Sequence, residues 1–176
     1  MRLLGFVVLV ALATLPLPPA GAQTAGGVPD TVEQLKERII EKENAGKLGF
    51  RQFTLCTKID GFGQFEPAAG VKVQAGTKLQ FYYEPQNLFT KRADGSYQKW
   101  FTQDMIVRDA NGKELLRKDG ALDFNYKTRT PVFDVFGTNS LSLGELPPGK
   151  YEFEAVLHDQ LSKQDARYVF KFEIAP

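Results

Sequence analysis

The sequence predicts an all-β fold, an antiparallel β-sandwich preceded by a short amphipathic helix. Two observations lead to this prediction. After Phe50, apolar and polar residues alternate with a period of two in several stretches that are separated by Gly, Pro or Asn. One earlier stretch repeats its apolar residues at helical spacing instead. We expect the sandwich to span residues 50–176.

The first 22 residues have the pattern of a secretory signal peptide. Arg2 precedes an apolar run from Leu3 to Leu15, and Ala20-Gly21-Ala22 supplies the small residues of a cleavage site. The run is about 13 residues long, well short of the roughly 20 that span a bilayer. We therefore expect cleavage near Ala22 and export to the periplasm or the medium. No membrane span is expected in the mature chain.

Length, charge and cysteine content narrow the class of protein. The expected mature chain has 176 − 22 = 154 residues, the size of one domain. Without Arg2 it carries 21 basic and 21 acidic residues, and no basic cluster of the kind that binds nucleic acid. Cys56 is the single cysteine, so disulfides do not stabilise the fold, and we expect Cys56 to be buried on a strand.

Residues 23–49 are predicted to form a flexible segment and then the short helix. Either Asp30 with Glu33 or Thr31 with Gln34 supplies an N-cap and capping box. A single narrow apolar stripe on about four turns is too little for a stable isolated helix, so the helix must dock or fray. The stripe consists of Val32, Leu35 and Ile39, and Gly46 and Gly49 end the helix.

The sandwich is expected to contain mostly half-buried strands joined by tight turns. Strands are predicted at residues 53–62, 77–84, 97–109, 114–117, 140–143, 151–158 and 167–174. The sequences Asp94-Gly95-Ser96 and Asn111-Gly112 are typical of turns between strands. Residues 120–137 have no clear period; Pro131 favours an edge strand or a connection between sheets.

The clearest motif is the Pro-Gly turn before Tyr151, which resembles the tyrosine corner of immunoglobulin-like sandwiches. Together with LCTKIDGFGQFEP, AGTKLQFYYEPQN, IVRDANGKEL and LPPGKYEFEAVLHDQLSKQDARYVFKFEI, it makes residues 53–174 similar to a family of exported bacterial proteins of unassigned activity. The resemblance implies an immunoglobulin-like C-terminal domain outside the cytoplasm. It implies no catalytic residues.

Residues suited to catalysis or metal binding are sparse. His158 is the single histidine, and with Asp159 beside it but no nucleophile nearby it is interpreted as a surface residue at a strand end. Residues 109–113 fit a hairpin turn better than a calcium loop. Glu152 and Glu154 alternate outward, as on a solvated face. We therefore expect no enzyme activity, no cofactor and no metal.

Strict alternation places four apolar residues on the outer face of one sheet, where they would form a partner-binding patch. Three covers are possible: the helix, another protein, or a bulge before Met105 that turns one of the four, the tryptophan, inward. The four residues are Trp100, Ile106, Val156 and Val169.

The leading hypothesis is a non-catalytic interaction module of the cell envelope that binds another envelope protein or a glycan. The first alternative is a carbohydrate-binding module in which Trp100 and outward Tyr82 or Tyr97 stack on sugars, although Tyr82 and Trp100 are expected on opposite sheets. The second alternative is a protease-inhibitor-like sandwich, in which a loop within residues 86–97 enters an enzyme cleft.

Overall fold

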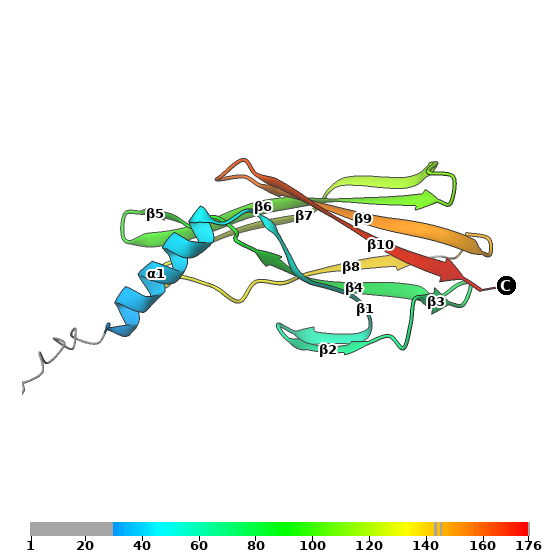
Figure 1. Cartoon of the computed structure of the whole chain (residues 1–176), viewed down its shortest axis with the longest axis horizontal. Coiled ribbons are helices and arrows are strands. Elements are labelled where there is room, and N and C mark those ends of the chain that lie inside the picture. Colours follow the sequence, from blue (N-terminus) through cyan, green and yellow to red (C-terminus); the bar gives the residue numbers. More distant parts are fainter. Residues whose placement is uncertain (1–29, 143, 145, 176) are drawn as a thin grey trace, which may run out of the picture. The chain divides into compact units, whose positions relative to one another are not determined.

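The computed structural model describes residues 30–142, 144 and 146–175. The expected signal peptide and residues 23–29 lie outside the described residues. The described chain contains one helix, α1 (Val32–Ala45), and ten strands in two sheets (Figure 1). The all-β prediction is confirmed, and the helix is found where the sequence predicts it. Thr31 caps α1, and its side chain and that of Gln34 form the reciprocal bonds of a capping box.

Sheet A has four strands in the order β2-β1-β4-β8, and all neighbours are antiparallel. These strands are β1 (Gly49–Gly61), β2 (Gln64–Pro67), β4 (Lys78–Gln86) and β8 (Gly137–Ser142). β2 folds back from the end of β1 and forms a short hairpin with it at the edge of the sheet. The pairing contains two register shifts.

Sheet B is organised around β6. One edge of β6 pairs with β5 and then with β9, the other edge pairs with β7, and β10 and β3 follow beyond β9. The strands are β3 (Lys72–Val73), β5 (Lys91–Ala93), β6 (Ser96–Asp109), β7 (Glu114–Thr128), β9 (Gly149–Asp159) and β10 (Asp165–Ile174).

The prediction of strand 114–117 followed by an irregular segment is wrong for β7, which runs to Thr128. Gly120, with φ +59°, interrupts the register against β6 between Gln103 and Met105. The Asp104 carboxylate accepts the Gly120 N–H at 2.8 Å, so the bulge is stabilised by a side chain of the neighbouring strand. A local bulge of this kind breaks the period of two without ending the strand.

The core lies between the inner faces of the two sheets. Phe81 of sheet A stacks on Phe153 of sheet B with ring centroids 4.2 Å apart, and Phe53 stacks on Tyr168 at 4.4 Å. Cys56 is buried and unpaired, as predicted, and burial raises the pKa of its thiol.

A polar cluster sits inside this core. The Gln103 and Asn139 amides bond to each other reciprocally at 2.8 and 2.9 Å, and the Tyr83 hydroxyl donates to the same Gln103 oxygen at 2.9 Å. Gln103 is fully buried. Burial raises the pKa of Tyr83, which therefore remains a neutral donor. The cluster ties β6 of sheet B to β4 and β8 of sheet A.

The expected turn and corner contacts are present. Gly112 has φ +79°, and the Asp109 carboxylate accepts the N–H groups of Asn111 and Lys113 at 2.9 Å, which confirms a hairpin turn. The Tyr151 hydroxyl donates to the Pro147 carbonyl at 2.6 Å, four residues upstream. This contact fixes the turn that leads into β9.

Gly137 lies opposite Tyr83 in the β4–β8 ladder, and a Cβ at Gly137 would overlap the Tyr83 ring. We expect Gly137→Ala to lower the free energy of unfolding by about 1–3 kcal/mol, because the buried ring can move only by breaking its bond to Gln103. Urea denaturation measures the change. Gly49→Ala is the control, since a Cβ there meets open space; equal losses in both variants would contradict the explanation.

Candidate functional site

The predicted patch residues lie on the outer face of sheet B, but two of them are inaccessible. Ile106 and Val156 are buried, Trp100 is half-buried, and Val169 is 43% exposed. The Trp100 indole donates to the Asp123 carboxylate of β7 at 2.9 Å. The expectation of an exposed four-residue apolar patch is therefore corrected for Ile106 and Val156.

Strand register also separates the four residues. Ile106 lies opposite Glu154, and Glu154 lies opposite Val169, so these positions are neighbours. Trp100 is six positions back along β6, roughly 20 Å away at about 3.3 Å per residue. The pairing of β6 with β9 is regular and its bulge is against β7, so Trp100 stays outward, opposite in phase to the core residue Phe101. The alternative in which a bulge before Met105 turns Trp100 inward is therefore wrong.

Charged side chains cover the apolar residues of this face. The Glu154 carboxylate is bound by Arg108 of β6 and by Arg167 of β10, the latter at 3.0 Å. Glu154 is only 3% exposed, so the prediction of a solvated face is wrong for this residue. Arginine stems extend along the sheet surface while their guanidinium groups pair with the central carboxylate, and this arrangement buries both Glu154 and its apolar neighbours.

A second charged cluster lies on the same face. His158 Nδ1 is 2.7 Å from the Asp165 carboxylate, and Nε2 is 3.0 Å from that of Asp104. Only a doubly protonated ring can donate to both carboxylates. Burial opposes the charge, but the bonds to Asp165 and Asp104 outweigh it and raise the pKa of His158. Burial likewise opposes ionisation of Asp104, but the Gly120 N–H and His158 hold its pKa below the usual range.

Asp159, which follows His158 in the sequence, holds backbone groups in place. It is buried and accepts the Phe89 N–H at 2.7 Å and the Leu161 and Ser162 N–H groups at 2.9 Å. Asp159 therefore fixes the β9–β10 turn and joins it to the loop before β5. The prediction of an ordinary surface histidine missed the Asp104–His158–Asp165 cluster, because Asp104 is 54 positions away in sequence.

Helix α1 docks on the β5–β6 end of sheet B through polar groups. The Asn44 amide makes two bonds to the Thr90 backbone at 2.7 and 3.0 Å. The buried Lys99 ammonium lies 2.8 Å from the Glu43 carboxylate and 3.1 Å from the Leu88 carbonyl. Glu37 binds Arg92 and accepts the Tyr97 hydroxyl at 2.8 Å.

The apolar stripe of α1 consequently does not face the sheets. Val32, Leu35 and Ile39 are 60%, 46% and 45% exposed, and Ile40 is the one fully buried apolar residue of the helix. The expectation that the stripe could dock on the outer face near Trp100 is therefore wrong. A docked helix that presents a row of aliphatic side chains to solvent is an uncommon arrangement.

The aromatic residues proposed to stack on sugars are used within the fold. Tyr82 is fully buried between Phe65, with ring centroids 4.3 Å apart, and Phe136, at 5.6 Å. Its hydroxyl donates to Glu84 at 2.6 Å and accepts the Gly63 N–H at 2.8 Å, and burial together with Glu84 raises its pKa to about 12. The prediction that Tyr82 is exposed on its sheet is wrong, because the β2 hairpin and residue 136 cover it.

The loop proposed to enter a protease cleft is held down at several points. Leu88 and Thr90 are buried, and their backbone groups bind Lys99 and Asn44. Residues 91–93 form β5, and the Asp94-Gly95 turn has the positive φ values of a tight hairpin, +50° and +65°. Asp94 and Gly95 of this turn are exposed.

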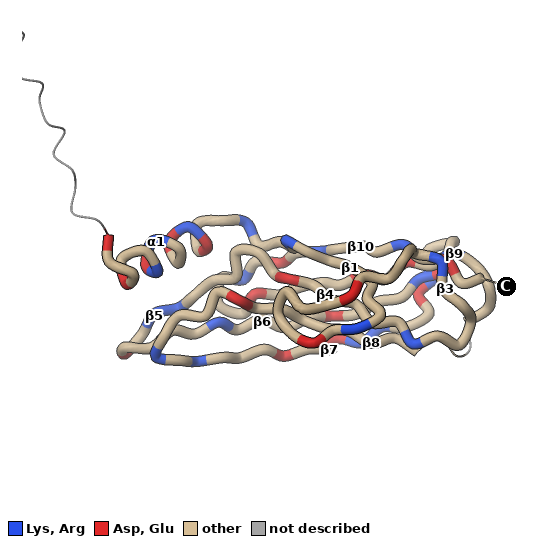
Figure 2. The backbone as a smooth tube through the Cα atoms, turned by 90° about the horizontal axis from the view of Figure 1, so that it is seen from below, with Lys and Arg blue, Asp and Glu red and all other residues tan. Residues whose placement is uncertain are grey.

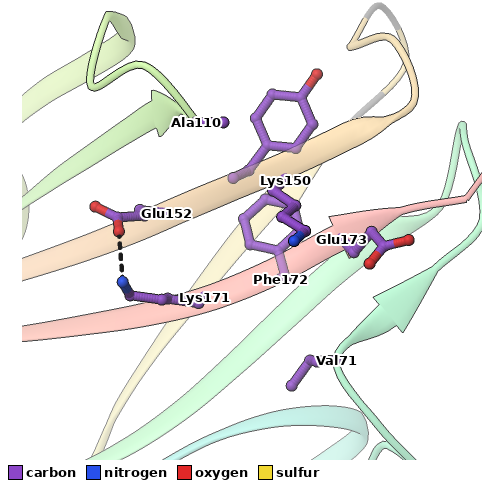
Figure 3. Close-up of a pocket in the computed structure, with 8 residues that line it drawn as sticks. Val71, Ala110, Lys150, Glu152, Lys171, Phe172 and Glu173 are labelled. Atoms are coloured by element: carbon purple, nitrogen blue, oxygen red, sulfur yellow. Dashed lines mark ion pairs between the residues drawn. The ribbon is translucent and has the colours of Figure 1, made fainter.

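A hollow of about 330 Å³ lies at the end of the β9–β10 pair, and Figure 3 shows the residues that line it. Its apolar lining comes from Val71, Ala110, Tyr151 and Phe172. Its two glutamates are in ion pairs: Glu152 binds Lys171 at 3.0 Å, as Figure 3 shows, and Glu173 binds Lys72 at 3.1 Å. Lys150 also lines the hollow. The lining mixes apolar, acidic and basic side chains, so its chemistry does not select one ligand.

The described residues contain no group of three or more His, Cys, Asp or Glu side chains placed to hold a metal ion. No helix in the described part of the chain is long and apolar enough to cross a membrane. Figure 2 shows basic and acidic residues interspersed along the strands and the helix.

Comparisons with known proteins add little. No protein-family model matches the sequence, and no curated protein is similar to it. Among solved structures, the Pseudomonas fluorescens alkylpurine DNA glycosylase AlkC, bound to DNA containing an abasic site analog, aligns over 81% of this chain with 7% identity and a TM-score of 0.42. The chain spans only about a third of that protein, 35% of its length.

The charge of His158 can be followed directly because it is the single histidine in the chain. We expect NMR titration to give a pKa above the ordinary 6.5 in the folded protein and near 6.5 after denaturation. The bonds to Asp104 and Asp165 favour the charged form, so this term stabilises the fold fully below pH 6.5 and is lost as the pH rises through the folded pKa.

Denaturation of the wild type and of His158→Gln checks this linkage. The stability gap between them is expected to be larger at about pH 5.5 than at about pH 8.5. Both values lie above the range where Asp104 titrates. A gap that is the same at both pH values would contradict a charged His158.

Glu43→Ala is expected to loosen α1 by leaving the buried Lys99 ammonium with one carbonyl partner. A loss of about 1–3 kcal/mol is expected, because a buried charge loses its counter-charge. Denaturation and hydrogen exchange of the α1 amides measure the effect. Glu41→Ala, an exposed site on the same helix, is the matched control. Unchanged exchange in Glu43→Ala would show that the ion pair does not hold the helix.

Proposed function

We propose that this chain is an exported, non-catalytic protein whose immunoglobulin-like sandwich serves as a protein-interaction module of the cell envelope. Export is supported by the leader-like pattern of residues 1–22. The two-layer β architecture agrees with the many extracellular binding domains built on sandwiches, although fold alone does not establish function.

The immunoglobulin-like assignment is supported by strand order. The last two strands, β9 and β10, pair with each other, and β9 pairs with β6, as the F, G and C strands do in that fold. β1, β4 and β8 form the facing sheet. The Tyr151 hydroxyl binds backbone four residues upstream at the start of β9, which is the geometry of a tyrosine corner.

The observation that carries the interaction role is the α1 stripe. Three aliphatic residues of one helix face are exposed, while Glu37 and Asn44 on the opposite side, together with Glu43 near the C-terminal end, fix the helix to the sheet. A surface that is already ordered loses little entropy on binding, and partner contact removes its apolar area from water. The non-catalytic role is supported by His158, since both ring nitrogens are occupied by carboxylates.

Capture from a cell-envelope extract of the source organism tests the proposal, with immobilised residues 23–176 as bait. We expect a partner protein in near-equal amount that binds at least about tenfold more weakly to Leu35→Glu/Ile39→Glu, because apolar anchors are lost. Val71→Glu, of similar exposure before β3, is the control. Retention of glycan without protein, or of no molecule at all, would contradict the proposal.

A further inference from the structure

The inner face of sheet B extends one strand beyond its cover. Inward positions of β6 and β7 lie side by side in the ladder, Val107 opposite Leu116 and Lys99 opposite Tyr126. Val107 and Lys99 are buried, whereas Leu116 and Tyr126 are 40% and 48% exposed. Sheet A ends at β8, which pairs with β4 on one side and with no other described strand. The place beside β8, opposite β7, holds no strand within the described residues.

A hollow of about 450 Å³ lies beside the end of β8, between β8 and β7. The described residues that line it are uncharged: Val107, Leu115, Leu116, Leu141, Ser142, Gly144 and Leu146. Because successive side chains of a strand point to opposite faces, every second side chain of a strand added to β8 would enter this hollow, and the side chains between them would point to the opposite face. A second hollow, of about 220 Å³, lies over β4 between β8 and residues 59–61 of β1, away from the free edge.

The β8 edge also lacks the features that block unwanted pairing. Residues 137–142 contain no charged residue and no proline. The exposed edge strand β7 carries several charges and the Gly120 bulge, and the edge strand β2 carries Glu66 and Pro67. Charges, prolines and bulges protect sheet edges from pairing with other chains. Among these three edges, only β8 is unprotected.

We propose that β8 accepts an added β-strand from a partner protein, an extended uncharged segment with aliphatic side chains at alternate positions. This inference rests on the proposed interaction function and assigns it a second surface and a mode of binding. A second copy of the chain is a poorer occupant. Its own β8 would offer Gly137, Asn139 and Leu141 inward, one aliphatic side chain among three, and the Asn139 amide is already bonded to Gln103.

The test uses a pool of capped heptapeptides with Val, Leu, Ile or Phe at alternate positions and Ser or Thr between them. A control pool has the same composition with the apolar residues consecutive. With the alternating pool at about 1 mM, a range that detects weak binding, we expect amide NMR shifts and slowed hydrogen exchange at residues 137–142. The control pool is expected to bind at least about tenfold more weakly.

Leu116→Glu places a charge in the hollow beside β8 at an already exposed site, and it should weaken binding of the alternating pool at least about tenfold. Val169→Glu, on the opposite face of sheet B, should not change it. Absence of shifts at β8 with the alternating pool would overturn the proposal. So would a dimer of the free chain that Leu116→Glu dissociates, since the second copy would then occupy the edge.

The two proposals fail separately. If the envelope extract yields no partner but the alternating pool binds β8, the interaction role in the envelope is wrong and the strand site stands. If an extract partner depends on Leu35 and Ile39 while the pool leaves β8 unchanged, the strand site alone is wrong.

Discussion

The hydrogen-bonded pair of Gln103 and Asn139 is the interaction on which the arrangement of the two sheets depends. Both amides are enclosed in an otherwise apolar core, and each satisfies the other, with the Tyr83 hydroxyl completing the cluster. A slip of β6 by one residue would turn Gln103 outward and leave buried polar atoms of Asn139 and Tyr83 unpaired, at a cost of about 1–3 kcal/mol for each group. The cluster therefore selects one register as well as stabilising it.

Once the phase of β6 is fixed, the other surfaces follow. Its inward positions fill the core, and its outward positions Asp104 and Arg108 meet His158 and Glu154 of β9. Near the start of β6, the Lys99 side chain lies against α1, and its buried ammonium group requires Glu43 as a counter-charge. The same strand thus determines core packing, the charged outer face and the position of the helix. The outer face is internally neutralised, which explains why apolar residues beneath it are buried without a partner.

The sequence predicts the parts of this fold that depend on neighbouring residues. Alternation located β9 and β10, and turn chemistry located the hairpins around Gly95 and Gly112 and the Tyr151 contact. The sequence did not predict which residues cover the outer faces of the two sheets. Glu154 is buried by arginines from two other strands, and Tyr82 by Phe65 of the edge strand β2. The face of α1 that docks was missed because Asn44 and Glu43 bind through polar groups, whereas periodicity detects only apolar contact.

Two groups of exposed apolar residues have separate causes. α1 docks through the buried Ile40 and through charges and amides, so its aliphatic stripe is left over, and β7 extends beyond the last strand of sheet A, so its inner residues are left half-covered. The Lys99–Glu43 pair fixes the helix, and the Gln103–Asn139 pair fixes the sheets. Apolar area that the chain itself does not cover is what a second polypeptide can remove from water, and this physical imbalance is the basis of both proposed binding surfaces.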